Sequence, residues 1–384
     1  MRDRISLLNR LLGVPLLTVA LGCGEAAGVP AVGFTYTFGP SPVDSVLQEE
    51  VDLAGGAGAD SVRLLISPEG GFKVFAAAVL PAEVARAAWL VDNPEVLAVV
   101  GPGGSREALQ VAPLYEAAGL ADLVPTATSR ALATAGHTTL PISPNDSVQG
   151  AFIAAFADSA LRARRAAIIY VADEYGIGLA AGTAAEFHAR GIEEVARVPL
   201  STWRACTGVD GPAYYATIAQ SLKRQGPLDV VVLASRTQEA VCAARALRQE
   251  LPALHLLAGD GVYVDEAVIR NWGPATERLF LVAFWHPSQA DSASQAFTAR
   301  FRAATGLTPR HGDAVFRDAA VLAATAIREG GRSREAVLAY LRSLGVTREP
   351  FQGITGPIAF VPGIQRPLLM TQVRNGESIL LGAR

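Results

Sequence analysis

The stretch Val96–Ser105, with the sequence VLAVVGPGGS, decides the fold class of this chain. Five consecutive apolar residues, Val96–Val100, are typical of a strand buried on both faces, which is how the strands of parallel sheets lie. A glycine-rich turn follows, and Ser105 precedes the helical stretch Arg106–Ala118, which Gly119 ends. A buried strand, a tight turn and a helix form the repeating unit of α/β proteins.

Similar short apolar runs recur along the chain, separated by helical stretches. Because they are continuous rather than alternating, they predict parallel strands in doubly wound sheets. The expected strands are Ala31–Thr35, Val62–Ile66, Val96–Val100, Ala166–Val171, Asp229–Leu233, Leu254–Ala258 and Leu279–Phe284.

The chain is too long for one such core. Single cores stop growing at about 250–300 residues, so a chain of 384 residues predicts two α/β lobes. Turn formers at Pro141–Asp146 and at His286–Ser288 mark the expected crossovers. We therefore expect one lobe from residues 31–144 plus 286–350, and a second lobe from residues 145–285 plus 351–384.

Composition excludes several classes of protein. With 50% hydrophobic and 18% charged residues, the chain is not intrinsically disordered. A net charge of -3 and a pI of about 6.0 provide no positive field for nucleic acid. No apolar run reaches the roughly 18 residues of a membrane-spanning helix.

The N-terminus has the pattern of an export signal. Three arginines, Arg2, Arg4 and Arg10, precede the uncharged run Leu11–Gly22, which ends at Cys23. The sequence ALGC at residues 20–23 resembles a bacterial lipobox, although its leucine stands one place later than usual. We expect residues 1–23 to be a lipoprotein-type signal segment, residues 24–30 a tether, and the protein to be anchored by its lipid in the periplasm or at the cell surface. The alternative is a plain secretion signal with an incidental cysteine.

Export leaves two further cysteines to interpret. Cys206 and Cys242 are an even pair in an oxidising compartment, which favours a disulfide. The alternative is two separate buried thiols, because sequence alone does not show the distance between their side chains.

Motifs of catalysis are missing. Arg106 stands where a dinucleotide-binding loop needs its third glycine. A nucleophile elbow around Ser105 would need a glycine at residue 107, where the chain has Glu107. No Gly-Lys-Ser/Thr triplet marks a P-loop, and the five histidines show no zinc-binding spacing. We expect no cofactor, no metal and no enzyme activity.

The turn at Gly101–Ser105 has the features of an anion site instead. Unpaired N–H groups and the positive end of the helix dipole attract negative charge, and Gly104 lets a ligand approach the backbone. Ser105 either donates its hydroxyl to such a ligand or is only the N-cap of the helix. Thr126 and Thr128 follow the next apolar segment, so they should lie beside Ser105 at the carboxyl edge of the sheet.

With these features the chain resembles the type 1 periplasmic binding proteins, specifically the branched-chain amino acid (Leu/Ile/Val) substrate-binding components of ABC transporters. The resemblance extends over roughly Val29 to Leu381, and Val99–Ser129 is its most specific part. The matching segments are Phe34–Pro40, Asn93–Arg130, Tyr170–Gly178, Asp229–Glu239, Ala258–Gly261, Thr308–Ala326 and Gly353–Phe360. The family implies two Rossmann-like lobes joined by a multi-strand hinge, which close on a ligand and deliver it to a membrane permease.

The resemblance also implies roles for individual residues. Ser105 would donate to the α-carboxylate of an amino acid, and Thr126, through its backbone, and Thr128, through its hydroxyl, would hold its carboxylate and ammonium. Tyr175 would cover the ligand from the second lobe. Asp260 would balance the ammonium, or else be a turn residue before a glycine.

Two positions depart from the family. Asp44 and Arg236 occupy places where relatives often carry aromatic residues, so a purely aliphatic pocket is disfavoured. We expect a polar or acidic ligand, unless both residues lie on the surface. The rival functions are a sensor with the same lobes, which signals instead of transporting, and an enzyme, which would need a nucleophile–base pair or a metal.

Overall fold

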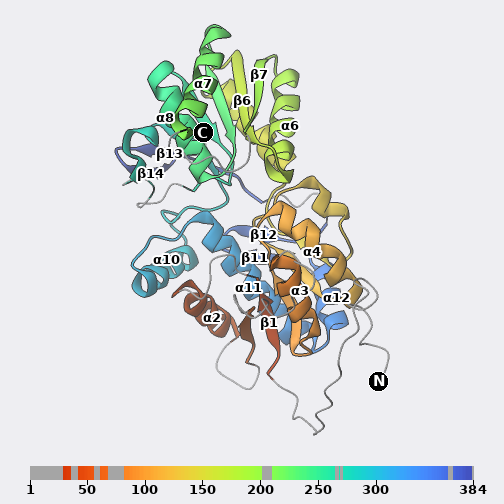
Figure 1. Ribbon diagram of the computed structural model, residues 1–384. Helices are drawn as coiled ribbons and strands as arrows, with labels where there is room; N and C mark the ends of the chain where they lie inside the picture. Colours follow the sequence, from red (N-terminus) through yellow and green to blue (C-terminus); the bar gives the residue numbers. More distant parts are fainter. Residues whose placement is uncertain are drawn as a thin grey trace.

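The computed structural model describes residues 29–35, 42–55, 61–67, 82–200, 210–263, 268, 271–361 and 366–382. Its helices and strands gather in two lobes, which are drawn one above the other in Figure 1. The expected signal segment with Cys23, most of the expected tether and Cys206 lie outside the described residues. Over the described ranges, no helix combines the length and apolarity needed to cross a bilayer.

The first lobe is built on a parallel sheet with the strand order β2-β1-β3-β4-β5. Its strands are β1 (Ala31–Phe34), β2 (Arg63–Ile66), β3 (Val96–Val100), β4 (Ala121–Val124) and β5 (Thr139–Pro141). Every residue of β1 and β3 is buried, as continuous apolar runs predict, and β4 is equally buried although it contains Asp122.

Helices from both halves of the chain cover this sheet, so red, orange and blue segments share one lobe in Figure 1. The early helices are α2 (Pro42–Gly55), α3 (Ala82–Asp92) and α4 (Ser105–Ala118), followed by the short 3₁₀ turn η2 (Arg130–Thr134). The late helices are α10 (Ser292–Thr305), α11 (His311–Gly330) and α12 (Arg334–Ser343). Of these, α11 packs on β1, β3 and β4.

The second lobe has a mixed sheet with the order β14-β13-β10-β9-β8-β6-β7. Its strands are β6 (Arg165–Val171), β7 (Glu193–Leu200), β8 (Val230–Ala234), β9 (His255–Ala258), β10 (Leu279–Ala283), β13 (Leu369–Arg374) and β14 (Glu377–Leu380). Its helices are α5 (Asp146–Ser159), α6 (Glu174–Ala189), α7 (Gly211–Arg224) and α8 (Thr237–Glu250), with the 3₁₀ turn η3 (Gly273–Ala275). The predicted α/β class with two wound sheets is therefore confirmed.

Three strands of this sheet were not among those expected from the sequence. β7 is an edge strand in which charged and apolar residues are mixed and several side chains are exposed, so it lacks a continuous apolar run. β13 and β14 pair antiparallel, β13 with β10 and β14 with β13. An antiparallel edge does not have to be apolar throughout, because one of its faces can remain in water.

The chain leaves the first lobe between β5 and α5 and re-enters it between β10 and α10. It crosses a third time, between β12 and β13. Before that return, residues 351–360 form the hairpin of β11 (Phe351–Gly353) and β12 (Gly356–Ile358). The sequence assigned this hairpin to the second lobe, but it packs against the core of the first lobe through Phe351, Ile358 and Phe360.

The carboxylate of Asp318 in α11 holds the hairpin in this place. Its oxygens accept hydrogen bonds from the backbone N–H groups of Ile354 (3.0 Å) and Thr355 (2.9 Å), and from the Thr355 hydroxyl. Arg366, in the third crossing, places Nη2 3.6 Å from the same carboxylate and donates from Nη1 to the carbonyl of Ile142 in the first crossing (3.0 Å). Asp318 thus ties two of the connections between the lobes to α11.

Replacing Asp318 should therefore destabilise the protein strongly. Asp318 is fully buried, and the Asp318→Ala variant would remove the carboxylate partner of Arg317 and Arg366 and the acceptor of two backbone N–H groups. We expect the free energy of unfolding to fall by about 3–5 kcal/mol, measured by urea denaturation. Asp158→Ala is the matched control, because Asp158 pairs with Arg164 at the surface and should cost less than about 1 kcal/mol. Equal losses in the two variants would contradict the anchoring role.

Candidate functional site

The turn between β3 and α4 begins the site. Gly101 has φ +100, a backbone conformation that suits glycine, and its N–H donates to the carbonyl of Leu123 in β4 (3.0 Å). Gly104 is the N-cap of α4 and has no side chain to cap the helix, so the first N–H groups of α4 receive no side-chain cap. Ser105 is therefore the first residue of the helix and not its N-cap.

The buried side chain of Ser105 faces the loop after β4. Its Oγ accepts hydrogen bonds from the backbone N–H groups of Thr128 (3.3 Å) and Ser129 (3.2 Å). Two donors occupy the lone pairs of the hydroxyl oxygen, so its proton is directed elsewhere. The structure thus brings Ser105 and Thr128 together, as the sequence predicted.

The two threonines of this loop have different surroundings. The hydroxyl of Thr126 donates to the carbonyl of Gly103 (3.0 Å), and this bond stabilises the turn. Thr128 is buried, and its carbonyl accepts from the backbone N–H of Asp146 (2.8 Å) at the start of α5. The first lobe's polar wall therefore continues directly into the first crossing between the lobes.

Tyr175 and Asp260 form the wall on the second lobe. Tyr175 lies in the first turn of α6, and its Oη accepts from the backbone N–H of Gly261 (2.9 Å). A Cβ atom at Gly259 or Gly261 would lie 2.6 or 2.9 Å from that oxygen, so both glycines are needed for this close approach. Burial, and then the charge of Asp260, raise the pKa of Tyr175 well above its usual value, so the phenol stays neutral.

Two carboxylates are buried at the junction of these walls. Burial raises the pKa of Asp260 to about 6, opposed by the nearby side chains of Gln149 and Tyr175. Burial also raises the pKa of Asp146 to about 7, and the charges of Asp260 and Asp173 add to this, while the Thr128 hydroxyl opposes it. Two buried acidic groups that repel each other favour a cation between them.

Asp146 is the site residue that sequence reasoning missed. It is the first residue of α5, and the N-cap is Asn145, whose Oδ1 accepts from the N–H groups of Ser147 (3.0 Å) and Val148 (3.2 Å). One turn further, Oε1 of Gln149 accepts from the backbone N–H of Asp260 (3.3 Å). An acidic residue directly after the proline-rich crossing was the available signal.

Arg236 lies at the edge of this cluster. It occupies the N-cap position of α8, its Nη1 is 2.6 Å from the carboxylate of Asp173, and its guanidinium lies 5.8 Å from the ring centroid of Tyr175. Asp44 lies in the first turn of α2, where a negative charge suits the helix dipole. Cys242 is buried in α8, and its expected partner lies outside the described residues.

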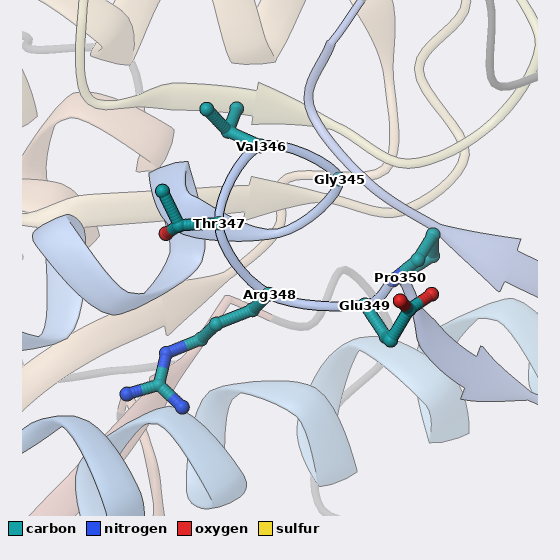
Figure 2. A pocket seen from close by; sticks show the side chains of 6 residues that line it. All are labelled: Gly345, Val346, Thr347, Arg348, Glu349 and Pro350. Atoms are coloured by element: carbon teal, nitrogen blue, oxygen red, sulfur yellow. The ribbon is translucent and has the colours of Figure 1, made fainter.

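The hollow in Figure 2 differs from this site in the residues that line it. It is enclosed by Gly345–Pro350, the loop after α12, and Figure 2 shows the side chain of Arg348 directed away from it. The N–H groups of residues 345–348 are used within the turn, on the carbonyls of Ser343 and Arg348. No buried polar side chain lines this hollow, so it offers little to a ligand. Over the described part of the chain, no group of three or more metal-binding side chains is present.

Comparisons with known proteins agree with this architecture. A curated "Amino acid binding protein" of Pseudomonas aeruginosa is 25% identical over 278 residues, which is 71% of this chain and 70% of that protein. The isoleucine complex of a branched-chain amino acid transporter substrate binding protein from Streptococcus pneumoniae matches with a TM-score of 0.76 and 18% identity, covering 92% of this chain and 99% of that one. A solute binding protein of R. palustris in complex with benzoate matches with a TM-score of 0.74 and 18% identity, covering 92% and 96%.

The sequence profile of a family described as periplasmic binding protein matches residues 81–377. This confirms the resemblance drawn from the sequence, and a family of binding proteins confirms the expectation that the chain is not an enzyme. Because the match extends over well more than half of its length, the chain belongs to the periplasmic binding protein family.

Proposed function

We propose that this protein captures a small amino-acid-like ligand between its two lobes and delivers it to an ABC permease. The observation that carries the proposal is the polarity of the site. A hydroxyl and a helix N-terminus from the first lobe suit an anion, and the buried carboxylates of Asp146 and Asp260 suit a cation. An amino acid carries both charges on adjacent atoms.

The contacts support a proposed role for each group. Ser105 donates its free proton to the α-carboxylate, assisted by the start of α4, and Gly104 permits close approach. The Thr128 hydroxyl and the backbone of Thr126 also contact the ligand next to its α-carboxylate. Asp260 and Asp146 accept from the ammonium, and Tyr175 covers the ligand. Contacts from both lobes then favour the closed state over the open one.

The two carboxylates favour an amine-bearing ligand. The curated relative is named as an amino acid binding protein, whereas the R. palustris structure contains benzoate, which has no cation. Binding such an anion here would leave Asp146 and Asp260 buried without a counter-charge, which is strongly unfavourable. The amino acid class is therefore the better fit for this chain.

Arg236 and Asp44 support a polar or acidic ligand side chain rather than an aliphatic one. Arg236 lies over Tyr175 and so borders the covered end of the site, although Asp173 shares its charge. The alternative, in which both residues act only at the surface, predicts a preference for leucine or isoleucine.

The location of the protein also belongs to the proposal. Residues 1–23 direct export, Cys23 carries the lipid anchor, and Cys206 pairs with Cys242 once outside. Loss of the protein from the membrane fraction in a Cys23→Ser variant tests the anchor.

The rival function is a sensor, which would have the same lobes and the same site. Purification of the membrane partner distinguishes the two functions, because a transporter would be recovered with a permease and a sensor with a receptor.

A thermal-shift screen should identify the ligand class. Selective binding to the folded state raises the melting temperature, so polar and acidic L-amino acids should raise it more than leucine, and benzoate should not raise it. Tight calorimetric binding of leucine with no competition from polar amino acids would refute the polar pocket. Stabilisation by benzoate alone would refute the amino acid class.

Ser105→Ala should weaken binding of the best amino acid from this screen. A lost hydrogen bond to a charged group corresponds to about 1–3 kcal/mol, measured by isothermal titration calorimetry. The matched control is Ser129→Ala, which removes a hydroxyl that caps the η2 turn through Ala131. Unchanged affinity in Ser105→Ala would remove Ser105 from the site, and an equal loss in the control would indicate damage to the loop instead.

Binding should also depend on pH. An ammonium stabilises the ionised carboxylates, so the complex holds fewer protons than the free protein over the range below the raised pKa values of about 7 for Asp146 and about 6 for Asp260. Affinity should therefore rise from pH 5 to pH 8, with proton release detectable by calorimetry in buffers of different ionisation enthalpy. Asp260→Asn should bind more weakly and with a flatter profile; a pH-independent wild type would contradict the ammonium site.

A further inference from the structure

Outside the crossings, contacts between described residues of the two lobes lie next to the proposed ligand site. The first is an ion pair between Arg106 of α4 and Glu174 of α6, with 3.1 Å between the charged atoms. Both of its side chains are nearly half exposed, and such pairs contribute little to stability. The second contact is made by Tyr263, which follows β9 and Asp260 in the second lobe.

The backbone of Tyr263 is clamped to its own lobe. Its N–H donates to Oγ1 of Thr237 (2.8 Å), and the Thr237 hydroxyl donates to its carbonyl (3.1 Å). Thr237 is the first residue of α8 and follows Arg236. Because one hydroxyl group holds both ends of the residue's backbone, the direction in which the Tyr263 ring leaves the second lobe is restricted.

The first lobe receives this ring at the start of α11. The ring stacks on His311, with centroids 4.9 Å apart and an interplanar angle of 25°, and the guanidinium of Arg310 lies 5.2 Å from its centroid. Gly312 follows Arg310 and His311 in the chain, and a Cβ atom there would lie 3.0 Å from the Tyr263 hydroxyl oxygen. The missing side chain at Gly312 is what makes room for the phenol.

The receiving surface is itself well supported. The N–H and the guanidinium of Arg310 both donate to the Asp313 carboxylate (2.7 and 3.2 Å). The buried ring of His311 lies edge-on to Phe284 and beside the backbone of Asp260. Burial and the charge of Arg310 lower the pKa of His311 to about 3, so it stacks as a neutral ring.

We propose that Tyr263 is the closure residue of this protein: it inserts between Arg310 and His311 when the lobes meet, seals the ligand site beside Asp260 and slows ligand release. This inference rests on the proposed function, since it assumes that the lobes close on a ligand. Tyr263 acts through the lobe arrangement and touches no ligand in the proposal. Its contacts with the first lobe are lost when the lobes separate, so they stabilise the closed state alone.

The test uses the full mature chain and a radiolabelled mixture of L-amino acids, with dissociation followed by rapid filtration. Tyr263→Ala should release label roughly three- to tenfold faster, the change that loss of an aromatic pair implies, with little change in the association rate. Tyr263→Phe keeps the stacked ring and should behave like the wild type. Tyr214→Ala is the matched control, since Tyr214 packs on Tyr215 within the second lobe.

Gly312→Ala separates closure from general stability. Alanine favours a helix over glycine, so the melting temperature should hold or rise, yet the added methyl group crowds the Tyr263 hydroxyl and should speed release. Combining it with Tyr263→Phe should restore part of the slow release. A variant that is merely less stable would instead combine faster release with a lower melting temperature.

Two outcomes would overturn different claims. If the wild type binds label and Tyr263→Ala releases it at the wild-type rate, the closure role is wrong and the proposed function stands. If the wild type retains no labelled amino acid, the proposed function fails, and small-angle scattering then tests whether Tyr263 holds the lobes together. An identical radius of gyration for the wild type and Tyr263→Ala would overturn that role, and a larger radius for the variant would support it.

Discussion

The arrangement of the two lobes depends on the carboxylate of Asp318. This buried group joins the middle of α11 to the β11–β12 hairpin and, through Arg366, to the first and third crossings. A buried ion pair is retained only with complete hydrogen bonding, and here backbone donors and a hydroxyl provide it. The same helix covers the first sheet and carries Arg310–Gly312 at its start. One helix thus sets both where the lobes are joined and where they meet.

The charges of the site make the ligand part of its electrostatic balance. Asp146 and Asp260 are both buried and interact electrostatically, and Arg236, which lies over Tyr175, is engaged with Asp173. In the free protein, burial raises the pKa of both carboxyl groups, and the charge of Asp260 adds to this at Asp146, so protonation is favoured. A bound ammonium replaces that proton, so charge neutrality rather than shape would be the first criterion by which this site selects among small molecules.

Sequence patterns predicted the parts of the structure that local physics determines. Continuous apolar runs identified β3, β6 and β8, and the turn Gly101–Ser105 placed one side of the site, because both signals lie within a few residues. The sequence did not reveal Asp146 as a candidate site residue, because its role depends on Asp260, more than a hundred residues away. The β11–β12 hairpin was assigned to the other lobe for a similar reason: its place depends on Asp318, which no pattern near Phe351 reveals.

The interleaved order of the first lobe has a consequence for the way the protein is made. β1 to β5 come from the first 141 residues, but the helix that covers β1, β3 and β4 begins only at His311. A ribosome delivers residues in order, so one apolar face of this sheet stays uncovered while β6 to β10 of the second lobe are synthesised. Nascent chains in that state are prone to aggregate, and a holding chaperone acting before residue 311 emerges would protect them.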